Sequence, residues 1–206
     1  MQQDINALNS GPGAAQLPSH PSSMPRSNYW PNVKNAHLAK HPACEACLVQ
    51  GDGPQQVVPQ VHHIIPFQYC VYLGRPELEF HPNNLMTLCE GKGTNDHHIA
   101  IGHLGNFQHL NEAVAQDVAG PWKGLLKIAI EKLTDWIHRE RWPQKPLTDQ
   151  EKARLLALMT SRCGEQPSGS VEALIALWWG EGVLGTSPGT TIPPSPATGA
   201  KRSRPV

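Results

Sequence analysis

The chain has no long apolar run: no stretch of its 206 residues approaches the roughly 18 consecutive apolar residues of a membrane-spanning helix. Its first residues, MQQDINALNSGPG, also lack the basic segment and the apolar segment of a secretory leader. These absences argue against a membrane helix and predict a cytoplasmic protein, in a compartment that keeps thiols reduced.

An excess of charge of either sign is also lacking, since 17 Lys and Arg residues balance 17 Asp and Glu residues. A strongly basic chain would indicate phosphate binding over a broad surface. Its absence argues against a tight, nonspecific DNA coat protein. It leaves room for an enzyme that meets DNA through a local patch and a metal ion.

Cysteine is scarce and odd in number, with five residues, whereas histidine is abundant, with 11. An odd number of cysteines mixed with histidines argues against a disulfide framework. Nine of the histidines lie between His37 and His109. Histidine is the commonest metal ligand and a base near neutral pH, so this cluster indicates a chemical role.

The two ends of the chain are rich in small and polar residues and in proline. Residues 1–27 and 185–206 lack apolar periodicity and are predicted to be disordered. The basic end of the tail, Lys201 to Arg204, is interpreted as solvated rather than as a phosphate contact. Two folded parts are expected between these ends, a first over 28–112 and a helical extension over 113–184.

The first part mixes helix and strand, which predicts an α+β fold. Pro31 suits a first helical position, and the residues VKNAHLAKH after it predict a short helix. The segment VVPQVHHII predicts a strand, a proline-containing loop follows, and residues 84–89 predict a second strand. The segment HHIAIGHLGNF is expected to be helical, although its glycines weaken that prediction.

The extension shows apolar residues at helical spacing in WKGLLKIAIEKLTDWIHRERW. Thr148 with Glu151 matches a capping box and predicts the start of another helix. Residues 171–179 predict a last short helix. These helices carry no constellation that suggests chemistry, so they are interpreted as packing mass or as a partner surface that includes the tryptophans.

Cys44-x-x-Cys47 has the spacing of a zinc knuckle, in which a tight turn brings two thiolates to one ion. Cys89 offers a third thiolate, and His97 is preferred to two other histidines, His41 and His81, as the fourth ligand. A closed Cys3His site of this kind would hold a structural zinc that stabilises a small domain. The alternative is a pair of free thiols. Of the remaining cysteines, Cys70 is expected to be buried packing and Cys163 inert.

Adjacent histidines in a strand, as His62 and His63 are predicted to be, point to opposite faces and suit a division of labour. One would bind a metal ion and the other would act as a base. Asn84 has an amide that can hold a neighbouring loop or orient a histidine ring. His98 offers a second ligand from the following helix.

The order Cys-x-x-Cys, His-His-Ile-x-Pro, Pro-x-Asn-Leu-x-x-Leu-Cys and then His resembles the HNH endonuclease family, over about residues 30–110. The resemblance implies a ββα-metal core braced by a structural zinc. It also implies roles for single residues: His62 and His98 as metal ligands, His63 as general base and Asn84 as the central asparagine. Cys44, Cys47 and Cys89 match the bracing cysteines. Many zinc-braced relatives have Cys-His where this chain has His97-His98.

His103 matches a third metal-binding histidine found in some family members. On a regular helix, however, residues five apart are about 140° apart around the axis. This separation is poor for binding one ion together with His98, unless the helix deforms at Gly102. A metal ligand or DNA contact and a helix-surface role therefore both stay open.

The resemblance implies hydrolysis of DNA phosphodiester bonds to 5′-phosphate and 3′-hydroxyl ends. A divalent ion would stabilise the developing charge, and the base would take a proton from the attacking water. Imidazole ligands accept several ions, so Mg²⁺, Mn²⁺, Ni²⁺ and Zn²⁺ all remain candidates. The predicted helix after Lys123 is expected to hold the phosphate backbone through Lys127, Lys132, Arg139 and Arg141.

Two other functions would use parts of the same sequence. A zinc-stabilised nucleic-acid-binding module without catalysis would keep the cysteines but would not need His62, His63, Asn84 and His98 together. A protein-interaction domain would use the tryptophan-containing helices. Because all four residues are present, the enzyme is favoured.

Overall fold

The computed structural model describes residues 26–51, 57–91, 96–105, 107, 109–120, 123–124 and 147–185. Most of the predicted N-terminal segment, the tail from residue 186 and the predicted helix after Lys123 lie outside the described residues. The expected DNA contacts lie outside them too: Lys127, Lys132, Arg139 and Arg141.

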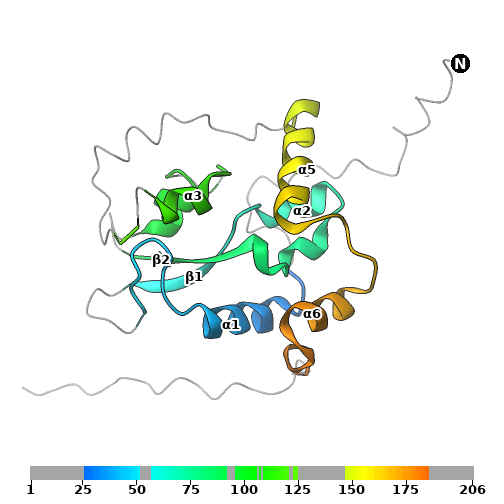
Figure 1. Ribbon diagram of the computed structural model, residues 1–206, viewed down its shortest axis with the longest axis horizontal. Helices are drawn as coiled ribbons and strands as arrows, with labels where there is room; N and C mark the ends of the chain where they lie inside the picture. The colour runs from blue at the N-terminus through cyan, green and yellow to red at the C-terminus, as the bar shows by residue number, and fades with distance from the viewer. Residues whose placement is uncertain are drawn as a thin grey trace, which may run out of the picture.

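A two-stranded antiparallel sheet lies at the centre of the fold, so the chain is α+β as predicted (Figure 1). β1 (Val58–His63) pairs with β2 (Leu85–Glu90), and His62 lies opposite Met86 in the register. The last three residues of β1 and the first five of β2 are buried. The sheet is therefore covered on both faces where β1 ends.

The segment between the strands, predicted to be a loop, contains three short helices: α2 (Phe67–Tyr72), η3 (Pro76–Glu79) and η4 (Pro82–Asn84). A proline precedes or begins each of them. Proline fixes a helical φ and lacks the amide hydrogen that a first helical turn leaves unpaired. The prolines that suggested a loop thus begin one short helix after another.

Two helices from opposite ends of the sequence pack together on one side of the sheet. α1 (Trp30–Lys40) has Pro31 in its first turn, as predicted, and contacts β1 and α6 (Val171–Trp179) (Figure 1). Ser170 caps α6, and the short η7 (Glu181–Val183) follows it. Their core includes Val33, Val61, Phe80, Leu85, Ile175 and Trp179.

The predicted capping box at Thr148 is present and begins α5 (Asp149–Cys163): Thr148 Oγ1 accepts from the Glu151 amide, and the Glu151 carboxylate accepts from the Thr148 amide. Leu155 and Met159 of α5 share a core with Ile65, Tyr69, Cys70 and Leu78 from the segment between the strands. α3 (Val114–Ala119) packs near the remaining core, around the knuckle cysteines. The described part of the helical extension therefore packs against the strand-bearing part.

None of the helices in the described ranges combines the length and hydropathy needed to cross a bilayer.

His37 on α1 gives a first prediction, on acid stability. It is 3% exposed and, among the described residues, neither ring nitrogen has a hydrogen-bond partner. Burial, followed by the charges of His41 and Lys40, lowers the pKa of His37 to about 4. Between these two pKa values, the unfolded chain binds a proton at His37 that the folded chain does not bind. Stability present above pH 6.5 is lost as the pH falls toward 4.

We expect His37→Phe to remove this contribution. Between pH 7 and pH 5 the variant should lose about 2 kcal/mol less free energy of unfolding than the wild type. Urea unfolding of both proteins at both pH values measures the difference. Other acid-sensitive groups are common to the two proteins and cancel, so equal losses would contradict the prediction.

Candidate metal centres

Cys44 and Cys47 lie in a tight turn between α1 and β1. The turn is closed by hydrogen bonds from the Leu48 amide to the Cys44 carbonyl (2.8 Å) and from the Cys44 amide to the Val49 carbonyl (3.0 Å). Leu48 has a φ of 63°, a left-handed conformation that a non-glycine residue adopts at a cost. The local fold therefore turns both thiols toward the same point.

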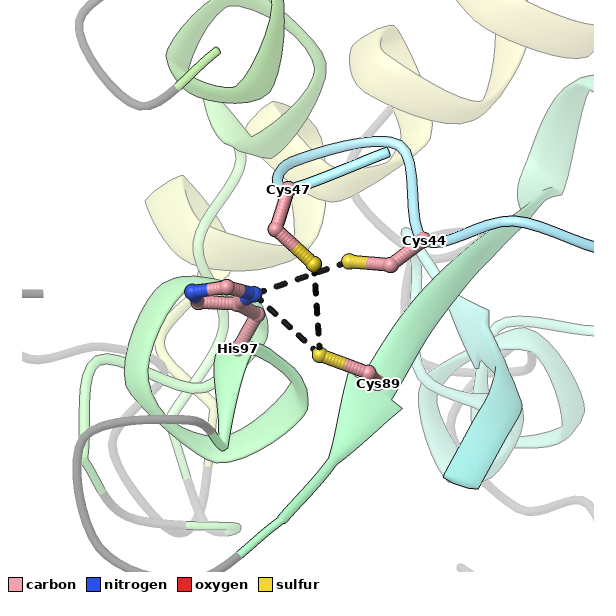
Figure 2. A group of neighbouring side chains, drawn as sticks. All are labelled: Cys44, Cys47, Cys89 and His97. Carbon is pink, nitrogen blue, oxygen red and sulfur yellow. Dashed lines mark hydrogen bonds between the residues drawn. The ribbon is translucent and has the colours of Figure 1, made fainter. Parts of the chain in front are cut away.

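Cys89 from β2 and His97, just before the next helix, complete the group (Figure 2). Cys47 Sγ lies 3.8 Å from Cys89 Sγ, and His97 Nδ1 lies 3.6 Å from Cys44 Sγ and 3.2 Å from Cys89 Sγ. Tetrahedral bonds of about 2.3 Å to sulfur and 2.1 Å to nitrogen place sulfurs about 3.8 Å apart, and sulfur and nitrogen about 3.6 Å apart. The four side chains fit a closed zinc site.

The electrostatics of this cluster also favour a cation. Hydrogen bonds from Cys47 and then Cys89 lower the pKa of Cys44, whereas the hydrogen bond with Cys44 raises the pKa of Cys89. Burial alone would lower the pKa of His97, but hydrogen bonds with Cys44 and Cys47 raise it to about 9. Neighbouring thiolates repel one another at these distances, so a divalent ion is needed to ionise them together.

The two other histidines considered for this site are elsewhere. His81 accepts a hydrogen bond from the Asn83 amide and contacts the Trp178 ring edge to face, and the ring of His41 packs at a tilt against that of His37. Cys70 is fully buried, as predicted, and Cys163 is partly exposed; both are free thiols.

A second group joins three histidines, His62 of β1, His98 and His103. Their candidate ligand atoms all lie within 4.8 Å of one another. The ring centroids form a triangle with sides of 5.3, 4.8 and 5.1 Å, and the ring planes are steeply inclined. Ligand atoms on one ion lie about 3 to 3.5 Å apart, so small ring rotations would bring all three to bonding distance.

His98 and His103 share a face because the helix between them is not a regular α-helix. The element η6 (His98–Gly102) is a π-helix, whose hydrogen bonds join residues five apart. Residues at this spacing therefore return to nearly the same side, where a regular helix would separate them. Such turns are frequent at functional sites. The helix deformation that His103 needs in order to share one ion with His98 is therefore present, and the deformed turn includes Gly102.

Two of the three rings are held by partners typical of metal-binding histidines. His98 Nδ1 lies 2.8 Å from Glu90 Oε1, and His103 Nδ1 lies 3.1 Å from the His109 carbonyl oxygen. These acceptors place the proton on Nδ1 and leave the lone pair on Nε2, as assigned from the partners. Ligating histidines usually donate their other N–H to a carboxylate or a carbonyl in this way.

His62, the third ring, is 1% exposed, and neither of its nitrogens has a hydrogen-bond partner in the described part of the chain. Burial, followed by the charges of His103 and His98, lowers its pKa well below the ordinary value. Burial and His98 likewise lower the pKa of His103 to about 4. Both rings are therefore neutral near pH 7, which is the form that binds a metal ion. A buried polar ring without a partner is costly, and a bound ion would remove that cost.

Gly102 leads to a second prediction. A Cβ at this position would lie 2.9 Å from Cε1 and 3.0 Å from Nδ1 of buried His62. We expect Gly102→Ala to displace His62 and to weaken metal binding at the three histidines by at least about tenfold. Gly182→Ala is the matched control, because a Cβ there meets no atom within 4 Å. Calorimetric titration of Ni²⁺ into zinc-loaded proteins measures the effect, and equal affinities in all three proteins would refute it.

His63, the last residue of β1, is not one of these three candidate ligands, although His98 and His103 lie near enough for their charges to act on its ring. Its ring packs on Trp30 with centroids 4.5 Å apart, and its Nε2 lies 3.2 Å from the Glu79 carbonyl oxygen. That carbonyl can only accept, so Nε2 carries the proton and Nδ1 the lone pair. Burial, followed by the charge of Arg26, lowers the pKa of His63 well below the ordinary value.

Asn84 is fully buried and all its side-chain groups are used within the fold. It accepts from the Ile65 amide (2.7 Å) and donates to the carbonyls of Ile65 (3.1 Å) and Leu78 (2.9 Å). Of the two roles considered from the sequence, the structure has it holding the neighbouring loop. No hydrogen bond joins it to a histidine ring among the described residues. It is therefore a positioning residue for the loop that follows His63.

The two clusters share neighbours in sequence. Cys89 and Glu90 are adjacent on β2, and His97 and His98 are adjacent at the next helix. In each pair the first residue belongs to the cysteine cluster. Of the second residues, His98 belongs to the three-histidine cluster and Glu90 contacts His98. One strand and one turn thus set the geometry of both.

No family model, curated protein or solved structure matches this chain. The chemistry of the two clusters therefore has to follow from their own side chains.

Three residues beside the clusters or beside His63 do not follow from the sequence: Glu90, Glu79 and Arg26. Of these, Glu90 could most easily have been predicted. Side chains alternate along a strand, so Glu90 lies on the face of β2 opposite to the ligand Cys89. Arg26 belongs to the segment predicted to be disordered, yet it packs against His63.

Proposed function

We propose that the chain is a metal-dependent endonuclease of the HNH type, which hydrolyses DNA phosphodiester bonds. The observation that carries the proposal is the convergence of His62, His98 and His103 on one point, next in sequence to the buried neutral His63. In this proposal β1, β2 and the turn with η6 form the ββα-metal core, and the cysteine cluster braces it.

The two clusters suit different tasks. Four protein ligands close the coordination of a tetrahedral zinc, so Cys44, Cys47, Cys89 and His97 suit a structural ion. Three histidines leave positions open for water or substrate, which a catalytic site requires. An ion bound there would supply Lewis-acid stabilisation to a phosphate oxygen and to the leaving oxygen.

The protein residues supply the base and its orientation. His63 takes a proton from the attacking water at Nδ1, because Nε2 donates to the Glu79 carbonyl. Its lowered pKa keeps it neutral and able to accept that proton near pH 7. Asn84 fixes the loop after His63 and so limits how far β1 can shift. Glu90 and the His109 carbonyl orient the rings of His98 and His103.

Nicking of supercoiled plasmid by the zinc-loaded protein tests the proposal. We expect no cutting without an added divalent ion. With an all-imidazole ligand set, we expect stronger cutting with Ni²⁺, Co²⁺ or Mn²⁺ than with Mg²⁺, which prefers oxygen ligands. His98→Ala should abolish cutting and keep the structural zinc. If the folded, zinc-loaded wild type cuts no DNA with any of these ions, the nuclease proposal is wrong and a noncatalytic nucleic-acid-binding module becomes the better account.

A further inference from the structure

Arg26 lies against the proposed base, and its side chain is held from several directions. Its guanidinium carbon lies 4.9 Å from the ring centroid of Trp30 and 4.8 Å from that of Phe67. Nη1 donates to Glu79 Oε1 at 3.1 Å and lies 3.4 Å from His63 Nε2. A long flexible side chain is thus fixed in one place by two rings and a carboxylate.

The Glu79 carboxylate needs this partner. The Glu79 side chain is only 2% exposed, whereas the Arg26 side chain is 38% exposed. Burial raises the pKa of Glu79, and the hydrogen bond from Arg26 acts against it. The ion pair therefore has one buried end, at Glu79, and one end that reaches solvent beside His63.

Most of the donors of Arg26 remain available. A guanidinium has five N–H donors, and only Nη1 is engaged with the described residues. The Nε and Nη2 donors form a planar fork that matches two phosphate oxygens. Because the side chain is already ordered by its neighbours, little conformational entropy is left to lose when a phosphate binds.

We infer that Arg26 is a phosphate-binding residue, which holds a DNA phosphodiester beside His63 through its free donors. This inference rests on the proposed function, since it gives that site its contact to the substrate. A base that removes a proton from water attacking a phosphorus atom must lie close to the phosphate. Arg26 is the cation that the structure fixes at that place.

The simpler alternative is that Arg26 is only a structural brace, which neutralises Glu79 and holds the start of the described chain against η3. A structural brace and a phosphate ligand respond differently to substitution. Arg26→Lys keeps a charge for Glu79 and for the aromatic rings, but it loses the planar fork. Arg26→Ala removes both functions. Arg154→Ala is the matched control, since Arg154 pairs with Glu112 on another part of the surface and the variant loses the same charge.

The experiment measures binding of a fluorescent DNA duplex by anisotropy over a range of salt concentrations, with every variant made in zinc-loaded His63→Ala protein so that the DNA stays uncut. For Arg26→Ala we expect affinity to fall by about tenfold and the slope of log affinity against log salt to fall by about 1. Arg26→Lys should bind more weakly than its parent at an unchanged unfolding temperature. Arg154→Ala should match the parent.

Equal affinities and salt slopes in the parent, Arg26→Lys and Arg26→Ala would overturn the inference and leave Arg26 as a brace. A parent that binds no DNA would overturn it as well. Plasmid nicking by the wild type is scored separately. Binding that depends on Arg26, without nicking, would therefore reject the nuclease proposal and retain the phosphate contact. Nicking with binding that does not depend on Arg26 would retain the nuclease proposal and reject the phosphate contact.

Discussion

Cys89→Ser is expected to produce a chain that holds no zinc at the cysteine cluster and does not fold. Cys89 is fully buried, and three of the four cluster residues belong to one hydrophobic core with Val57, Ile64 and Leu88. Structural zinc contributes on the order of 10 kcal/mol in small zinc domains, which is comparable to the whole stability of a domain. Circular dichroism and zinc content of the purified variant measure the outcome.

Cys163→Ser is the matched control. Cys163 is a partly exposed free thiol at the end of α5, outside the cluster. This variant should keep its zinc and unfold within about 1 kcal/mol of the wild type. A Cys89→Ser protein that folds and melts like Cys163→Ser would show that the cluster is a packed group of thiols and not a metal site.

His63→Ala is expected to lower the rate of plasmid nicking by about 100-fold or more, because a positioned base contributes at least that factor. The variant should keep its structural zinc and its affinity for a second ion, since His63 is not one of the candidate ligands of either cluster. Initial rates of nicking at saturating metal, with metal affinities from calorimetry, make the comparison.

His81→Ala serves as the matched control for loss of a histidine ring. His81 lies before η4 and contacts Trp178 and the Asn83 amide, away from both clusters. Its variant should nick at nearly the wild-type rate. Equal rates in His63→Ala and the wild type would remove His63 from the base role, even if the protein proved to be a nuclease.

The sequence predicted those parts of the fold that depend on local chemistry. The capping box at Thr148, the proline in the first turn of α1 and the segment of α6 follow from residues within a few positions of each other. The four residues of the cysteine cluster were also predicted, because Cys44-x-x-Cys47 has zinc-knuckle spacing, and Cys89 at the second predicted strand and His97 supply the other two ligands of a Cys3His site.

The parts that the sequence leaves open or does not reveal depend on tertiary contacts or on an unusual backbone. A regular helix separates His98 from His103, and nothing in the sequence specifies a π-helix between them. The contact of His62 with Gly102 exists only once β1 has packed on that turn. Arg26 meets Glu79 across 53 positions of sequence, so its role could not be inferred from its neighbours. The short helices in the segment after His63 could not be predicted, because proline is common both in loops and in first helical turns.

The adjacent pairs Cys89–Glu90 and His97–His98 imply that the two clusters are energetically linked. A zinc ion that fixes Cys89 and His97 also fixes the backbone that carries Glu90 and His98. Affinity for an ion at the three histidines should therefore depend on an intact cysteine cluster, although no ligand is shared.

Titration of metal-free protein with Co²⁺, followed by near-ultraviolet and visible absorption, tests the two-site arrangement most directly. Thiolate ligands give charge-transfer bands and imidazoles alone do not, so the two clusters report separately. We expect a first equivalent that produces the thiolate bands and a second that does not, with only the second lost in His62→Ala. A single equivalent in the wild type, or a second equivalent that persists in His62→Ala, would contradict a metal site at His62, His98 and His103.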